Sequence, residues 1–151
     1  MNKKFLLILV ASLLAFVGCE KRFEHVIIDD RNVTTNNNQQ YERLVQRYAE
    51  YWDCMSKKDF DCAYRYEMPY QRFLHDLHWY KSFNRNNDQN YKIILLGIIP
   101  KEENKVLVKS KFISNDKKVT YVFYDKWYNV DDEWFHRMKV SLLPFGVNNE
   151  E

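Results

Sequence analysis

The chain of 151 residues is long enough for one domain with a hydrophobic core and too short for several domains of ordinary size. Its 23 Lys and Arg residues nearly balance its 21 Asp and Glu residues, so no basic excess favours binding to nucleic acid. Aromatic residues make up 17% of the chain, while Gly and Pro number only three each. We therefore expect few long loops, and either a core filled with rings or an aromatic-lined cavity.

The N-terminus has the pattern of an export signal. Lys3 and Lys4 precede an apolar run over residues 5–17, which ends at Gly18 and Cys19. This run is shorter than the about 20 residues of a membrane-spanning helix, and small residues at its end are typical of a signal peptide. Residues 16–19 resemble the lipobox of bacterial lipoproteins, although that family usually has Leu where this chain has Phe. The alternative is an ordinary cleaved signal with a chance cysteine.

The lipobox resemblance implies a signal peptide over residues 1–18 and acyl chains on Cys19, which would anchor the protein in the cell envelope, facing the periplasm. Each buried methylene contributes about 0.8 kcal/mol, so several acyl chains hold stably. Cleavage also removes Lys3 and Lys4, which leaves no net charge to attract nucleic acid or anionic lipid. By the same resemblance, Glu20 favours the outer over the inner membrane.

Residues 19–40 are interpreted as a lipidated tether. They show little periodicity and end in the polar stretch 34–40, although residues 26–28 could form a short strand. A flexible chain of this length spans about 25 Å root-mean-square, which would let the domain stand clear of the lipid head groups.

Three helical segments are expected next. In the first, which ends near residues 56–58, apolar residues recur at three- and four-residue intervals: Tyr41, Leu44, Val45, Tyr48, Trp52 and Met55. Asp59 is a candidate N-cap for a second, shorter helix that carries Phe60, Ala63 and Tyr64. Pro69 breaks or restarts this helix. A third apolar stripe consists of Tyr70, Phe73, Leu74, Leu77 and Tyr80.

Cys54 and Cys62 would lie in the last turn of the first helix and the first turn of the second. Export to a compartment that permits disulfides favours a bond between them. Two alternatives stay open. A zinc site would use paired CxxC spacing, which the chain lacks, and two free buried thiols are also compatible with the pattern.

The pattern changes to strands after the polar loop over residues 84–90. Residues 91–99 form an apolar, β-branched run that ends at Pro100, and residues 106–113 and 119–130 alternate apolar with polar positions. Asp131 and Asp132 form a turn, and a last strand has Trp134, His136, Met138 and Val140 in one row. The order predicts an α+β domain over residues 41–145, with helices on a curved antiparallel sheet of about four strands, and a tail over 146–151.

Several short motifs resemble the nuclear-transport-factor-like cone fold. They are Lys-Lys-Asp-Phe-Asp at residues 57–61, Met-Pro-Tyr-Gln-Arg at 68–72, and a closing hairpin with Lys-Trp-Tyr at 126–128 and Asp-Glu-Trp-Phe-His-Arg at 132–137. The resemblance spans residues 41 to about 140 and implies a cone-shaped α+β domain. That fold hosts dehydratases, isomerases, binding modules and assembly factors, so it does not by itself assign a function.

Histidines supply the candidate catalytic and metal-binding side chains. His75 and His78 are three apart on a helix, but zinc would need further ligands, so solvated helix histidines are the alternative. His136 shares a strand face with aromatic residues, and in cone-fold enzymes a histidine in this position is a general acid or base. Asp53 could partner it, and so could Asp125 if the strand has no bulge. A satisfied core histidine is the competing interpretation.

Trp127, Tyr128 and Trp134 flank the closing turn and are candidates for a partner-binding surface, although rings of this kind more often fill a core. Together these features predict a lipid-anchored binding or assembly module for an envelope protein complex. A cone-fold enzyme of the dehydratase or isomerase type and a carrier of a small apolar ligand are the alternatives. No cofactor, metal or nucleic acid is expected, and a homo-oligomer stays open.

Overall fold

The computed structural model describes residue 23 and residues 25–28, 39–87 and 91–140. Its elements in chain order are β1 (Val26–Ile28), α2 (Gln39–Ser56), α3 (Phe60–Tyr64), α4 (Pro69–Leu74), α5 (Leu77–Asn84), β2 (Lys92–Glu102), β3 (Lys105–Ile113), β4 (Thr120–Val130) and β5 (Glu133–His136). The expected signal peptide, Cys19 and the tail over 146–151 lie outside the described residues. None of the described helices has the length and apolar character needed to cross a bilayer.

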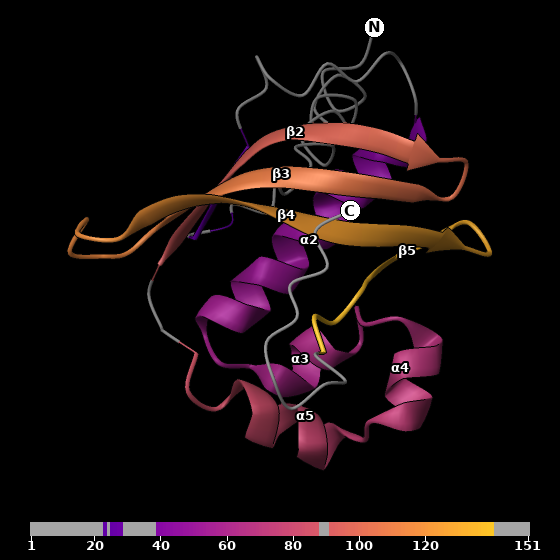
Figure 1. The fold of residues 1–151 in the computed structure, drawn as a ribbon, viewed down its shortest axis with the longest axis horizontal. Helices are drawn as coiled ribbons and strands as arrows, with labels where there is room; N and C mark the ends of the chain where they lie inside the picture. The colour runs from indigo at the N-terminus through magenta and orange to yellow at the C-terminus, as the bar shows by residue number, and fades with distance from the viewer. Residues whose placement is uncertain (1–22, 24, 29–38, 88–90, 141–151) are drawn as a thin grey trace, which may run out of the picture.

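The domain is α+β, with a curled sheet in the order β1-β2-β3-β4-β5 (Figure 1). The four strands expected from the sequence form antiparallel pairs, and β1 adds a fifth strand parallel to β2. Val26 is buried in this added strand, so part of the segment interpreted as a tether belongs to the domain. Three residues are too few to show a period, which is why the sequence pattern could not separate this strand from a loop.

Alternation along the strands creates one buried face, called here the inner face. β3 and β4 pair without a bulge from Lys105 opposite Tyr128 to Ile113 opposite Thr120. The largest apolar side chains of the inner face are Ile93, Leu95, Val106, Val108, Phe112 and Trp127. Because the register is unbroken, Asp125 also lies on this face, two residues before Trp127.

β2 continues through Pro100, where the sequence predicts the strand to end, as far as Glu102. β1 pairs only with residues 93–95, so no described strand lies beside β2 on that side at Pro100. Another residue at this position would direct its N–H toward the unpaired edge. Proline, which has no N–H, therefore loses no sheet hydrogen bond here.

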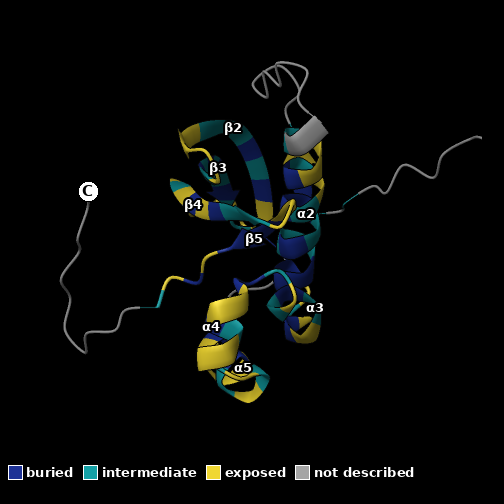
Figure 2. Cartoon of the chain, turned by 90° about the vertical axis from the view of Figure 1, so that its right-hand side faces the viewer, coloured by how far each residue is buried: buried dark blue, intermediate teal, exposed yellow. Residues whose placement is uncertain are grey.

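Helix α2 crosses the inner face of the sheet, as Figure 2 shows in side view. Its apolar stripe is the one predicted, with Leu44, Tyr48 and Met55 buried against the strands. The Tyr48 hydroxyl donates a hydrogen bond to Ser110 Oγ at 2.6 Å, and its ring lies 5.8 Å from the Trp127 ring. The aromatic content of the chain is thus largely used to fill the space between α2 and the sheet.

The third predicted stripe is divided between two helices, and its first half is wrong. α4 ends at Leu74, and His75 is its C-cap; the carboxylate of Asp76 then caps α5 by accepting a hydrogen bond from the Trp79 N–H at 2.8 Å. This new start resets the helical phase, because a cap requires a non-helical backbone. As a result Phe73 is 90% exposed and Leu74 65% exposed, while Tyr80 is buried.

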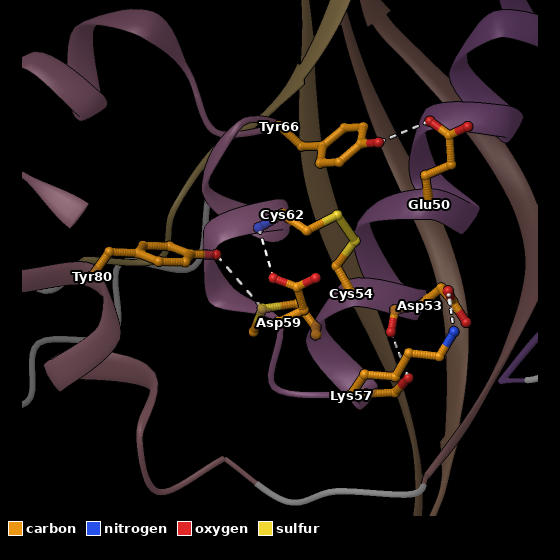
Figure 3. The surroundings of a disulfide bond; sticks show 10 residues. Glu50, Asp53, Cys54, Lys57, Asp59, Cys62, Tyr66 and Tyr80 are labelled. Atoms are coloured by element: carbon orange, nitrogen blue, oxygen red, sulfur yellow. Dashed lines mark hydrogen bonds and ion pairs between the residues drawn. A yellow bond between two sulfur atoms is a disulfide. The ribbon is translucent and has the colours of Figure 1, made fainter. Parts of the chain in front are cut away.

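A disulfide between Cys54 and Cys62 holds the corner between α2 and α3 (Figure 3), with the two Cα atoms 5.8 Å apart. Asp59 is the predicted N-cap: its carboxylate accepts a hydrogen bond from the Cys62 N–H at 3.1 Å. Lys58 enters the corner with a φ of 56°, in the left-handed region. The capped turn therefore brings the two cysteines together.

Removal of this disulfide should destabilise the domain. In the chain-entropy model, the loop of about nine residues predicts that the double variant Cys54→Ala/Cys62→Ala loses roughly 2.5 kcal/mol of unfolding free energy. Urea unfolding of the parent and the variant, each with and without a reducing agent, measures this loss. Reduction should affect only the parent. Two alkylatable thiols in protein taken from its native envelope would contradict the expectation.

Candidate functional site

The His136 cluster consists of Glu67, Asp125 and His136, which lie between the helices and the end of the sheet. His136 is only 5% exposed. Its Nδ1 atom lies 2.8 Å from Glu67 Oε2, within hydrogen-bonding distance, and its Nε2 atom lies 3.7 Å from Asp125 Oδ1. The imidazole therefore sits between two buried carboxylates and is directly bonded to one of them.

Backbone hydrogen bonds place Glu67 beside the last strand. Glu67 follows α3 and forms an isolated parallel bridge with His136. On either side of it, the His136 N–H donates to the Tyr66 carbonyl at 2.7 Å and the Met68 N–H donates to the His136 carbonyl at 2.9 Å. The side chains of Glu67 and His136 are thus brought together by the same contact that joins the two segments of backbone.

Other side chains complete the hydrogen bonding of both carboxylates. The hydroxyls of Tyr51 and Tyr80 donate to Glu67 Oε1 at 3.2 and 2.9 Å. The Trp52 indole N–H donates to Asp125 Oδ2 at 3.1 Å. The Tyr51 ring packs 4.4 Å from the His136 ring. Burial and the charge of Glu67 raise the pKa of both tyrosines, so their hydroxyls stay protonated and act as donors.

The charge on His136 depends on two opposing effects. Burial, the largest of them, lowers its pKa, because the charged form loses its hydration. The charge of Glu67 and the neighbouring carboxylate of Asp125 together outweigh burial and raise the pKa from 6.5 to about 9. His136 is therefore an imidazolium at neutral pH, and the cluster can supply a proton more readily than it can accept one.

Two hollows lie beside the cluster. One, of about 250 Å³, is lined by Tyr51, Trp52, Met55, Glu67, Tyr80, Phe83, Asn84, Asn87, Asp125, His136, Met138 and Lys139. The other, of about 340 Å³, is lined by Trp52, Met55, Asn86, Asn87, Tyr91, Phe112, Val119, Tyr121, Phe123 and Lys139. Lys139 lies on both, and its Nζ atom is 3.4 Å from Asp125 Oδ1. The cluster thus forms part of the wall of an open, aromatic-lined depression.

Of the two predicted partners of His136, the structure brings together only one. Asp125 lies beside the imidazole because β4 has no bulge. Asp53 instead forms an ion pair with Lys57 at 2.8 Å (Figure 3). Glu67, the closer carboxylate, was not predicted, because it lies between two short helices, in a stretch without periodicity.

His75 and His78, the two histidines predicted to share a helix, are separated by the start of α5. His75 stacks on Trp79, with ring centroids 4.0 Å apart, and His78 is exposed on α5. Within the described residues, no group of three or more His, Cys, Asp or Glu side chains has the arrangement of a metal site.

The predicted partner surface at the closing turn is wrong for both tryptophans. Trp127 is 0% exposed and Trp134 is 1% exposed. Asp131 and Asp132 both have positive φ, as in a two-residue hairpin turn, and the resulting register turns both rings toward α2. Tyr128, on the opposite face, is half-buried and bonds to Arg137. The tryptophans are core residues and cannot contact a partner directly.

Comparisons with known proteins identify no family. No protein-family model matches the chain, and no curated protein matches it. Among solved structures, the chain is similar to the solution structure of a SEC-C motif containing protein from Rhodopseudomonas palustris, with 12% sequence identity and a TM-score of 0.39. The match covers 66% of this chain and 85% of that chain. A likeness this distant carries no argument about function.

The raised pKa of His136 predicts a specific pH dependence of stability. Because the folded pKa of about 9 lies above the ordinary 6.5, the stabilisation by protonated His136 is complete below pH 6.5 and is lost as the pH rises through 9. The shift corresponds to about 3 kcal/mol. Urea unfolding between pH 6 and pH 10 should show the decline, and His136→Gln should flatten it. NMR titration of the parent is the direct check, and an imidazole that titrates at or below 6.5 would contradict the expectation.

Proposed function

We propose that the protein is a lipid-anchored envelope protein whose α+β domain is a binding module for an envelope protein complex. The signal-like residues 1–18 and the cysteine that follows them support the anchor. The curled sheet with α2 across its inner face supports the finer proposal of a nuclear-transport-factor-like cone fold.

The observation that carries the binding function is an exposed apolar surface on α4 and α5. It is defined here by Tyr70, Phe73, Leu74 and Phe83, which are all large, and each is about half exposed or more. Figure 2 shows α4 largely in yellow, at the end of the molecule away from β2. Phe83 extends a row of stacked rings with Trp79 and His75. Exposed apolar side chains of this size, gathered on two neighbouring helices of a small domain, are typical of interaction sites.

The His136 cluster also favours a binding module over an enzyme, because its own hydrogen bonding is already complete. The oxygens of Glu67 already accept three hydrogen bonds, and the side chains of the cluster are almost completely buried. A set of charges that satisfies itself is typical of a structural network. On α4, in contrast, Phe73 and Leu74 are mostly exposed.

Substitution of the exposed anchors should separate binding from folding. Phe73→Ser/Leu74→Ser should weaken partner binding by about 2 kcal/mol or more. The free energy of unfolding should change by no more than about 1 kcal/mol, because neither the Phe73 nor the Leu74 side chain is buried. A photo-crosslinking amino acid at position 70, in cells, reports binding, and thermal melts report folding. Val119→Ser, about half exposed just before β4, is the control. Equal crosslinking in the double variant and the parent would refute this surface.

The anchor has its own test. Cys19→Ser should abolish labelling by a fatty-acid analogue and release the protein from the membrane fraction, because the acyl chains supply the attachment. Cys62→Ser, which leaves the lipobox intact, should keep the label. Continued labelling of Cys19→Ser would rule out lipidation at this residue.

A cone-fold enzyme of the dehydratase or isomerase type is the second candidate, and the position of His136 on the wall of the 250 Å³ hollow favours it. The protonated imidazole would be the general acid, and Glu67 would hold its Nδ1 atom. A folded His136→Gln variant that loses all biological activity, while Phe73→Ser/Leu74→Ser keeps it, would favour the enzyme. The reverse pattern supports the binding module.

A further inference from the structure

The outer face of the sheet, opposite the inner face, carries a group of lysines without acidic partners. These outer-face lysines are Lys92, Lys109, Lys111 and Lys126, at the positions that alternate with the buried ones. Within the described residues, none of the four forms an ion pair, whereas Lys57, Lys81 and Lys105 each do. Their charges are therefore available to an external anion.

Acidic side chains are missing from the same part of the face. The only acidic residue of β3 and β4 is Asp125, and it lies on the inner face. Glu102, at the end of β2, is paired with Lys105. Although positive and negative charges balance over the whole chain, they are not evenly distributed, and the outer face of the sheet is positive. Composition alone suggested no attraction to anionic lipid, but the net charge of the whole chain does not describe the charge of this face.

Apolar and aromatic side chains lie between the outer-face lysines. Lys111 is opposite Val122, Lys109 is opposite Tyr124, and Lys126 is opposite Leu107. Val122 and Tyr124 are each nearly half exposed. Lysines that surround partly exposed apolar and tyrosine side chains suit the boundary between lipid head groups and acyl chains.

The proposed anchor brings this face close to a bilayer. Only residues 20–25 separate Cys19 from Val26, and Val26 pairs with Ile93 in β2, next to Lys92. Even fully extended, this segment reaches about 25 Å. The domain therefore cannot stand far from the head groups as a longer tether would allow. The α4–α5 surface lies at the opposite end of the molecule from β2 (Figure 1).

We propose that the outer face of the sheet docks on anionic phospholipid head groups of the leaflet that holds the acyl chains. This proposal rests on the lipid anchor of the proposed function. The docked domain then presents the α4–α5 surface at the end of the molecule away from β2, where a partner can contact it. The attraction is electrostatic, so it weakens as the salt concentration rises.

Lysine footprinting of the lipidated full chain tests the docking. The protein is reconstituted in vesicles of phosphatidylcholine, with or without phosphatidylglycerol, and acetylated briefly before mass spectrometry. With phosphatidylglycerol, the outer-face lysines should react at least about fivefold more slowly, because docking shields them from the reagent. Each lysine near an anionic surface favours the docked state by about that factor. High salt should restore their reactivity. Lys57 and Lys58, in the turn after α2, and Lys81, on α5, should react equally in both vesicles.

Lys92 is the reporter for the variants. In Lys109→Gln/Lys111→Gln/Lys126→Gln its protection should be lost, and in the matched control Lys57→Gln/Lys58→Gln/Lys81→Gln it should persist. Equal reactivity of the outer face in both vesicles overturns the docking. So does protection seen only in native membranes, which would assign the face to an acidic protein. Failure of the protein to float with pure phosphatidylcholine vesicles overturns the anchor instead, and with it the docking on the anchored leaflet.

Discussion

The buried ion pair between Glu67 and His136 connects the helical half of the chain to the end of the sheet. The two residues are 69 positions apart, and backbone hydrogen bonds on either side of Glu67 hold them in place. Gln71, one turn further on, accepts a hydrogen bond from the Met138 N–H and donates one to the Met138 carbonyl. α4 is thereby fixed through polar contacts to the segment that follows β5.

Such a pair is costly to bury, so its surroundings decide whether it stabilises the fold. Two carboxylates and an imidazolium lose their hydration, and the attraction between them compensates only if the remaining lone pairs also find donors. Tyr51, Tyr80 and Trp52 supply those donors from α2 and α5. Removal of one partner would leave a buried charge uncompensated, at a typical cost of about 3–5 kcal/mol. The network therefore selects one arrangement of the helices more than it adds stability.

Strand alternation and helical periodicity predicted most of the core from the sequence. The inner face, including Asp125 and His136, follows from residues two apart, and the stripe of α2 follows from residues three and four apart. The failures occur where a local contact overrides the period. Asp76 caps a new helix and turns Phe73 and Leu74 outward, and β1 is too short to have a period. Glu67 is found only through the parallel bridge to His136, a contact between distant segments that no local pattern contains.

The position of the cluster explains why the exposed surface of α4 persists. A six-residue helix is too short to be stable in isolation, and its apolar side chains would be expected to fold inward. The hydrogen bonds of Gln71 and the Glu67–His136 pair instead hold the polar side of α4 against the segment after β5, which leaves Phe73 and Leu74 facing solvent. A buried, expensive polar network that keeps apolar residues exposed is hard to explain by stability alone. Under the proposed function, this arrangement keeps those residues free to meet a partner, and the His136 cluster then serves binding indirectly, by fixing the surface proposed to bind.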